Sequence, residues 1–297
     1  MSAWKRRVVS LWSALSVLTL AAPAMAGSND LELSRFATFN DTTDESGCTE
    51  TCGFAEPDDQ LFYDLSRDLG QVMAPRFVAP SETLGQAGFA VMFMGSLSAI
   101  PHNERHWQEG VRDRNPESTL FTGHLQVRKG LPFSFEVAGN LGYLYDSEMF
   151  TMGADVRWAL NEGFYYFPDV GVRGTVNTVV GARELNMVNV GWDVSASKSF
   201  ALGGVMALTP YVGFQQLYVI SSSRVLNAYP EDPRPPQFNP DSPGQVFAPE
   251  FVFSQEQIQI NRFLGGLRMH VWILNFTLEA VFSDTVQQYT FAGGVDF

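Results

Sequence analysis

The sequence predicts an all-β protein: a closed, antiparallel, up-and-down transmembrane β-barrel of about ten strands. From Gly88 to Phe297, apolar and polar residues alternate with a period of two in ten separate segments, which is the pattern of strands with one apolar face. Four of the connections between these segments are short or moderate, and two others are long. Only 17% of the residues are charged, whereas an ordinary soluble domain carries about 25%.

The ten segments are each close to the length that crosses a bilayer at a tilt, about 9–11 residues. Their number is even, as is typical of bacterial barrels. Soluble β-sandwiches also alternate, so alternation alone does not decide between the two folds. The expected strands cover residues 89–98, 121–128, 133–143, 150–158, 170–176, 188–195, 205–216, 262–270, 274–282 and 289–297.

The connections favour the barrel, because short turns on one side and long loops on the other are typical of membrane barrels. The short or moderate ones are 129–132, 161–167, 198–204 and 270–273, and the long ones are 101–118 and 217–257. The longest holds seven of the 16 prolines. We expect the C-terminus and the segment before the first strand at the short-turn, periplasmic side.

Aromatic residues gather at the ends of the expected strands, which indicates two interfacial girdles. The short-turn side carries Phe133, Trp158, Tyr165, Tyr166, Phe167, Phe200 and Trp272, and the opposite side carries Tyr143, Tyr145 and Phe150.

Residues 1–26 have the pattern of a cleavable secretory signal peptide. Lys5, Arg6 and Arg7 precede a 15-residue apolar run from Val8 to Ala22, and Ala24-Met25-Ala26 forms an A-x-A cleavage site. Cleavage would remove three cations and no acid, so the mature chain would carry 16 − 32 = −16 charges. This acidic balance excludes a nucleic-acid binder, which needs an excess of cations.

Residues 27–85 form an acidic segment with 12 Asp or Glu and three Arg. One amphipathic helix is expected near residues 57–72, with an apolar stripe of Leu61, Phe62, Leu65, Leu69 and Val72. The stripe fits an ordinary surface or core helix, and it also fits a helix that plugs the barrel. The expected domains are therefore a signal peptide (1–26), a periplasmic or plug segment (27–85) and a barrel (86–297).

The only cysteines are Cys48 and Cys52. In an oxidising compartment they are expected to close a small disulfide loop. No histidine lies near them in the sequence, so no metal site is expected there.

The last strand carries a specific resemblance. Residues 287–297 read QQYTFAGGVDF, with Tyr289, Phe291, Val295 and the terminal Phe297 on one face. This resembles the C-terminal assembly signal of Gram-negative outer-membrane β-barrels, the porin-like superfamily. The resemblance implies an outer-membrane location in the cell envelope, recognition by the barrel-assembly machinery, and contact with outer-membrane lipid and lipopolysaccharide.

The inward face of the expected barrel carries ionisable groups of both signs. A ten-strand barrel is only slightly wider than an eight-strand barrel, which side chains fill. The groups therefore fit a salt-bridge network that fills a narrow lumen, and they also fit a polar channel for small solutes. They are His124, Arg128, Glu136, Asp155, Arg157, Arg173, Asp193, Arg262, Arg268, His270 and Glu279.

No catalytic motif is present, and we expect no enzyme activity, cofactor or metal. His102 and His106 lie beside Glu104 and Glu109 in a long loop, and such a pair could be catalytic or bind a metal. Because His–acid pairs without a catalytic motif are common, ordinary loop polarity explains them better. The leading hypothesis is a small-solute channel or an envelope structural or binding protein with a narrow charged lumen. The alternatives are an outer-membrane enzyme acting on lipid or peptide, and a surface adhesion protein that uses the Pro-rich loop.

Overall fold

The computed structural model describes residues 27–39, 55–164, 166–203, 205–228, 237–238, 246–247 and 250–297. The expected signal peptide, Cys48, Cys52, Tyr165 and all seven prolines of the Pro-rich loop lie outside these ranges.

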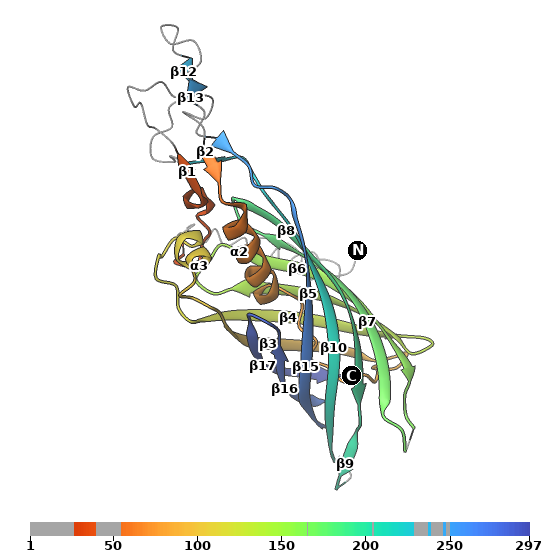
Figure 1. The fold of residues 1–297 in the computed structure, drawn as a ribbon. Coiled ribbons are helices and arrows are strands. Elements are labelled where there is room, and N and C mark those ends of the chain that lie inside the picture. Colours follow the sequence, from red (N-terminus) through yellow and green to blue (C-terminus); the bar gives the residue numbers. More distant parts are fainter. Residues whose placement is uncertain are drawn as a thin grey trace, which may run out of the picture.

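The main element is a closed antiparallel barrel of ten strands, which confirms the predicted fold class (Figure 1). Neighbouring strands pair in the order β15-β16-β17-β3-β4-β5-β6-β7-β8-β10, and β10 pairs with β15 to close the ring. The strands are β3 (Phe89–Ala99), β4 (Thr119–Leu131), β5 (Phe135–Leu144), β6 (Phe150–Asn161), β7 (Asp169–Val180), β8 (Leu185–Ser197), β10 (Met206–Ser223), β15 (Glu256–Val271), β16 (Leu274–Phe282) and β17 (Gln287–Asp296).

Alternation along each strand separates an apolar outer surface from a polar interior. In β6, for example, Val156 is 51% exposed on the outside, whereas its neighbour Arg157 is 2% exposed inside. Successive side chains of a strand point to opposite faces, so this inside–outside difference repeats around the ring. The outer surface is apolar in the way that contact with lipid requires.

The two long connections lie at one end of the barrel and the expected short turns at the other, but three of the connections at the long-loop end are short as well. The turn end has the connections 132–134, 162–168, 198–205 and 272–273, and the loop end has 100–118, 145–149, 181–184, 224–255 and 283–286. The strand expected at 205–216 continues to Ser223 in β10. Its partner β15 carries Gln257, Gln259 and Asn261 outward at the loop end, so this extension presents polar groups where the other strands present apolar ones.

The first and last strands join to close the barrel. β17 pairs with β3 over ten residue pairs, from Gln287 with Ala99 to Asp296 with Ala90. Phe297 continues the seam, because its N–H donates to the Phe89 carbonyl at 2.7 Å and its own carbonyl accepts from the Phe89 N–H at 2.9 Å.

The segment before the barrel lies at the loop end, not at the periplasmic side where we expected it. It contains η1 (Leu33–Phe36), β1 (Ala37–Phe39), β2 (Ala55–Pro57) and α2 (Asp59–Val72). Leu31 forms a β-bridge with Val111 of the long β3–β4 connection, which also holds α3 (Arg105–Gly110). Figure 1 shows α2 and α3 together at the end opposite β9 (Phe200–Leu202).

The helix itself matches its sequence pattern. α2 begins after Asp58, whose carboxylate accepts the N–H of Leu61 at 3.2 Å and so caps the helix. Loop lengths indicate only that β3 begins at the turn end. They could not show that α2 lies at the opposite end, because the chain between α2 and β3 passes through the barrel.

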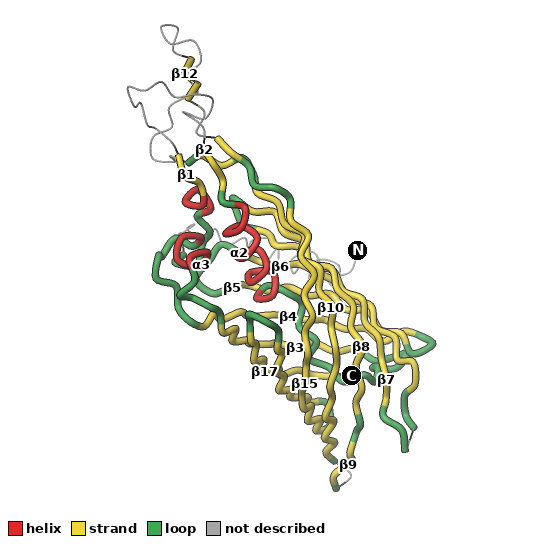
Figure 2. Tube along the Cα trace, in the orientation of Figure 1, coloured by secondary structure: helices red, strands yellow, loops and turns green. Residues whose placement is uncertain are grey.

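The aromatic residues expected at the turn end are exposed there. Phe133, Trp158, Tyr166, Phe167, Phe200 and Trp272 are all among the exposed large side chains. At the loop end, the connections contain two short antiparallel pairs: β11 (Leu226–Asn227) with β14 (Glu250–Phe251), and β12 (Gln237–Phe238) with β13 (Val246–Phe247). Figure 2 shows β12 beyond the end of the barrel that holds the helices α2 and α3.

Candidate functional site

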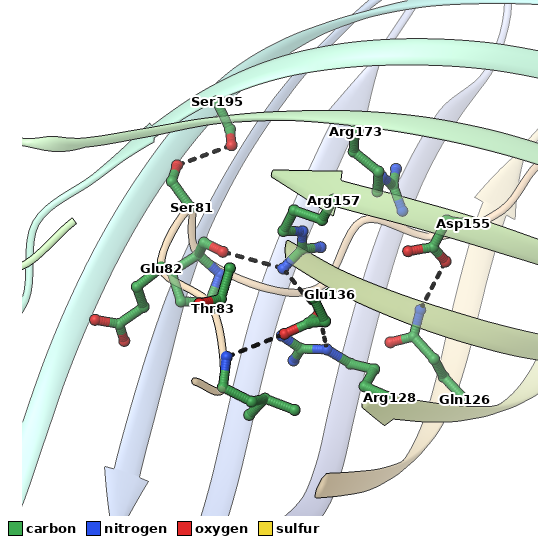
Figure 3. A network of polar contacts seen from close by, with 12 residues as sticks. Ser81, Glu82, Thr83, Gln126, Arg128, Glu136, Asp155, Arg157, Arg173 and Ser195 are labelled. Atoms are coloured by element: carbon green, nitrogen blue, oxygen red, sulfur yellow. Dashed lines mark hydrogen bonds and ion pairs between the residues drawn. The ribbon is translucent and has the colours of Figure 1, made fainter. Parts of the chain in front are cut away.

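Residues 73–87, which we call the strap, run through the lumen from the end of α2 to the start of β3. At the loop end, the Asn177 amide donates to the carbonyl of Met73 at 2.7 Å. Midway, the Arg157 guanidinium donates to the carbonyl of Pro80 at 3.1 Å (Figure 3). Near the turn end, Glu136 accepts the N–H of Leu84 at 3.2 Å. The lumen therefore contains the chain's own N-terminal segment over its whole height.

The helix α2 seals the upper lumen with an apolar core of the kind found in soluble domains. Leu61, Phe62, Leu65, Leu69 and Val72 are all buried and pack in one cluster with inward side chains of the long strands. Leu217 and Val219 of β10 and Ile258 and Ile260 of β15 belong to that cluster. The Phe62 ring stacks on Phe253 with the ring centres 4.6 Å apart.

Gly70 allows α2 to pack closely against the barrel wall. A Cβ atom at this position would lie 2.5 Å from Val219 of β10. Glycine normally weakens a helix interior by about 1 kcal/mol relative to alanine, but here it permits the close approach of helix and strand.

Phe77 occupies the centre of the strap, between two cations. The guanidinium carbons of Arg157 and Arg173 lie 5.1 and 4.8 Å from the centre of its ring. The Tyr211 ring packs against it at 5.6 Å. Cation–π contacts are stronger in desolvated sites than at the surface, so this arrangement fixes Phe77 across the middle of the lumen.

Val78, the next residue, has a left-handed backbone with φ of 39°. Its N–H donates to Glu279 at 2.8 Å, and the Tyr211 hydroxyl donates to the same carboxylate oxygen at 2.8 Å. A β-branched residue rarely adopts this conformation, so the surrounding contacts hold the strap in a strained turn.

Arg76 joins the strap to three strands without an ion pair among the described residues. Its guanidinium donates to Ser96 at 3.0 Å, to Thr122 at 3.0 Å and to Gln288 Oε1 at 2.7 Å. Arg262 donates to the same Gln288 oxygen at 2.6 Å. Gln288 thus holds two buried guanidinium groups and links β15 and β17 to the strap.

Nearer the turn end, Glu136 is the centre of a charged network (Figure 3). Its two oxygens accept from Arg128 at 2.7 and 2.9 Å, the paired geometry that arginine forms with a carboxylate. Arg157 lies 3.8 Å from the same carboxylate. All three side chains are at most 2% exposed, so two buried guanidinium groups share one buried carboxylate.

The other predicted lumen residues also lie in the barrel wall. Arg173 pairs with Asp193 at 2.8 Å, and Asp155 accepts from the Asn140 amide at 2.8 Å. Arg268 pairs with Asp296 and lies 4.0 Å from Glu82 of the strap. His124 is bonded to Thr122 at 3.1 Å and, like His270, is only partly buried.

At the loop end, a second polar cluster joins the plug helix to the loops. Asp68 of α2 is fully buried, and one of its oxygens lies 2.9 Å from His106 Nε2 and 3.2 Å from Trp107 Nε1. The other oxygen accepts from Thr285 at 2.7 Å and from Arg67 at 3.1 Å. The sequence placed His106 beside Glu104 and Glu109, but Glu109 pairs with Arg105 instead.

This cluster changes the acidity of Asp68. Burial alone would raise the pKa of its carboxyl group, but the hydrogen bonds from His106 and Thr285 and the Arg67 guanidinium lower it more. The pKa of Asp68 therefore lies below its usual value, and the carboxylate is the stable form at neutral pH.

Sequence reasoning missed the residues that fill the lumen from within: Arg76, Phe77, Val78, Tyr211 and Gln288. The strap residues are in a non-periodic run, APRFVAP at 74–80, which has no strand or helix pattern. One arginine between two prolines in an apolar stretch was the available signal, but it does not specify a position inside a barrel.

In the part of the chain that the structure describes, no three His, Cys, Asp or Glu side chains form a group that could hold a metal ion. Over the same residues, no helix is long and apolar enough to cross a membrane.

No protein-family model matches the sequence, and no curated protein matches it. Solved structures with a similar fold include Ail, the attachment invasion locus protein of Yersinia pestis, at 10% identity and a TM-score of 0.28 over 71% of this chain and 99% of that one. The KdgM porin has 6% identity and a TM-score of 0.33 over 70% and 99% of the two chains. The COG4313 outer membrane channel of Pseudomonas putida F1 has 11% identity and a TM-score of 0.34 over 75% and 99%.

The topology of the chain itself is that of a closed, antiparallel ten-strand β-barrel.

Proposed function

We propose that this chain is an outer-membrane barrel closed by its own N-terminal segment, and that it serves as an envelope structural or binding protein whose working surface is the loop end. The observation that carries this proposal is that the plug, residues 59–87, is held by side chains of all ten strands. They are Ser96, Thr122, Glu136, Arg157, Arg173, Ser195, Tyr211, Arg268, Glu279 and Gln288.

The energy of the seal supports a lasting closure. Five apolar side chains of α2 are buried in the upper lumen. Burial of one such side chain stabilises by about 1.5–3 kcal/mol, so expelling the helix would cost roughly 10 kcal/mol from this term alone. An equilibrium opening of that cost would be populated about once in 10⁷. A freely open channel is therefore poorly supported.

The loop end supports a binding or structural role. The N-terminal segment and the long connections pack on one another there: the Leu33 N–H donates to Glu184, Leu31 forms a bridge with Val111, and the Ser28 hydroxyl donates to Asp146. A barrel that only conducts solutes has no need of such a folded cap. The buried His106–Asp68 pair, with side chains 6% and 0% exposed, offers no access to a substrate and so gives no support to an enzyme.

Planar-bilayer recording of the purified full-length chain tests the proposal. We expect no steady conductance from the native protein. A variant that lacks residues 27–87 serves as the open reference, provided that heat-modifiable migration in gels shows it to be folded. The second variant, Phe77→Ala, keeps the segment but removes the ring that lies across the middle of the lumen. We expect this variant to conduct only in brief events. A large, steady conductance from the native chain would overturn the proposal.

A gated channel is the second candidate, and the left-handed Val78 favours it. Strain of this kind costs about 1–3 kcal/mol and would be released if the strap left its place. If the native chain conducts in bursts, Val78→Gly removes the strain and should make the bursts rarer. Bursts unchanged by Val78→Gly would remove the support for strain-driven gating.

A further inference from the structure

The direction of the chain through the barrel fixes the side on which its N-terminus lies. β3 begins at Phe89 at the turn end, the strap leads upward from there, and α2 ends the passage at the loop end. We infer that the mature N-terminus is carried through the lumen and displayed at the cell surface, where its α-ammonium group is anchored by Asp30. This inference rests on the proposed function, in which the plug, residues 59–87, passes through the lumen.

The first residues after the expected cleavage site are docked closely on the loops. A Cβ atom on Gly27 would lie 2.1 Å from the carbonyl oxygen of Asp146, so only glycine fits at this position. The Asn29 N–H donates to the same carbonyl at 3.1 Å, and the Asn29 amide donates to the carbonyl of Tyr145 at 3.0 Å. The segment is therefore packed against the loops from Gly27 onward.

Two carboxylates face the start of this segment. Asp30 Oδ2 accepts the N–H of Gly27 at 2.7 Å. Asp146 Oδ2 accepts both the N–H and the hydroxyl of Ser28, at 3.3 and 2.5 Å. The backbone nitrogen of Gly27 thus already lies at hydrogen-bond distance from one carboxylate, and the next residue is bonded to a second.

Cleavage would convert this nitrogen into a cation. Hydrolysis of the Ala26–Gly27 peptide bond by a signal peptidase adds water across it, leaving a carboxyl group on Ala26 and an amine on Gly27. At neutral pH most of that amine carries a further proton, since its usual pKa is about 7.7–8.0. The new ammonium group places a full positive charge at hydrogen-bond distance from the Asp30 carboxylate, so Coulomb attraction strengthens this contact after cleavage.

The chain offers an unusually clean test, because it has so few other amines. Beyond residue 26 its only lysines are Lys129 and Lys198, and both lie at the turn end. Lys129 Nζ donates to the carbonyl of Ala87 at 3.0 Å, and Lys198 Nζ donates to those of Phe164 and Phe167 at 2.7 and 2.9 Å.

Intact cells are treated with a membrane-impermeant N-hydroxysuccinimide ester, and peptide mass spectrometry then locates the acylated amines. We expect acylation of the Gly27 amine and none of Lys129 or Lys198, which should react only after the outer membrane is disrupted. The Asp30→Asn variant should acylate faster at Gly27, because a weaker anchor leaves more free amine, whereas Asp113→Asn, an exposed loop control, should not. An N-terminal amine that becomes reactive only together with the two lysines would overturn the inference.

A second measurement does not depend on the cleavage site. In a Cys48→Ser, Cys52→Ser background, single cysteines are placed at the exposed positions Glu56, Arg114 and Ala201 and exposed to an impermeant maleimide. Glu56→Cys belongs to the N-terminal segment, Arg114→Cys to a loop and Ala201→Cys to the turn end. We expect the first two to be labelled on intact cells and the third to be protected. If Glu56→Cys is protected as Ala201→Cys is, the inference is wrong.

These outcomes are separable from the proposed function. Surface labelling of Gly27 together with a large conductance would reject the closed barrel and keep the displayed N-terminus. Protection of Gly27 with no conductance would reject the displayed N-terminus and leave a closed barrel.

Discussion

Asp68 Oδ2 lies 2.9 Å from His106 Nε2, and this contact joins the plug helix to the loop that covers it. Both side chains are buried, at 0% and 6% exposure. The carboxylate makes four hydrogen bonds in all. Its environment indicates that the plug helix and the loops that cover it form one stable unit at the loop end.

Asp68→Asn should therefore destabilise the folded protein. Loss of a hydrogen-bonded carboxylate from a buried cluster costs about 1–3 kcal/mol. Asp64→Asn, one turn earlier on the same helix, affects a partly exposed pair with Arg67 and an exposed hydrogen bond from Gln60, and should cost less than about 1 kcal/mol. Urea unfolding in detergent or lipid, followed by tryptophan fluorescence, measures both. Equal effects of the two variants would contradict a special role for Asp68.

The contribution of Asp68 should also depend on pH. Because its pKa in the folded protein is lowered, the stability that it contributes is present above its unfolded pKa of about 3.9 and is lost as the pH falls through the folded value. The native protein and Asp68→Asn should thus differ at pH 7 and converge at strongly acidic pH. A constant difference across this range would show that the charge of Asp68 is not the source of the effect.

Glu184 should show the opposite sign. Burial raises the pKa of its carboxyl group, the Leu33 N–H lowers it in part, and nearby Glu32 raises it again. A carboxyl group whose folded pKa is raised destabilises the protein where it is charged, at pH above that value, and the penalty disappears as the pH falls below about 4.3. Glu184→Gln should raise the urea concentration at the midpoint of unfolding at pH 7 but not at pH 4. Glu104→Gln, on an exposed loop residue, is the control.

The apolar band of the outer surface can be mapped on a single strand. Leu267 and Gln259 lie on the same outward face of β15, eight residues apart, but only Leu267 is within the apolar band. An arginine on the lipid face near the bilayer midplane costs about 2–4 kcal/mol and about 0–1 kcal/mol near the interface. Leu267→Arg should be strongly destabilising and Gln259→Arg nearly neutral in vesicle folding assays. A large cost at Gln259 would place that position inside the membrane.

The terminal residue should matter for assembly. Phe297 exchanges two backbone hydrogen bonds with Phe89, and the two rings lie 6.5 Å apart across the closing seam. Deletion of Phe297 should lower the fraction of heat-modifiable, folded barrel in the outer membrane. Trp272→Ala, which removes another exposed aromatic side chain at the turn end, should leave that fraction close to the native value. Normal assembly of the deletion variant would remove the main support for the assembly signal.

The barrel could be predicted from the sequence because its physical cause is local. A period of two, as in Phe135, Glu136 and Val137, separates lipid from lumen without reference to any distant residue, and it also places Arg157 and Glu279 on the inner face. The partners of those groups could not be predicted, because the pairing of Arg128 with Glu136 and of Arg173 with Asp193 depends on strand register.

The contents of the lumen were least accessible to sequence reasoning. The apolar stripe of α2 showed that the helix buries one face, but the surface that covers it comes from Val219, Ile258 and Ile260, about 150–200 residues later in the chain. β15 begins at Glu256, before the strand expected at 262–270, and its extension carries Gln257 and Gln259 outward. Apolar alternation does not predict this part of the strand, because alternation stops being apolar where a strand leaves the membrane.

The threaded lumen is tested most directly by a disulfide between the strap and the barrel wall. The hydroxyl oxygens of Ser81 and Ser195 lie 2.8 Å apart, so Ser81→Cys with Ser195→Cys, in a chain whose native cysteines are serines, should form a cross-link without added oxidant in the folded barrel. Ser81→Cys with Ser98→Cys, which places the second cysteine at the level where Gln288 bonds Ser98 near the loop end, should not. Free thiols at both Ser81→Cys and Ser195→Cys in the folded protein, with no gel shift under non-reducing conditions, would contradict the threaded plug.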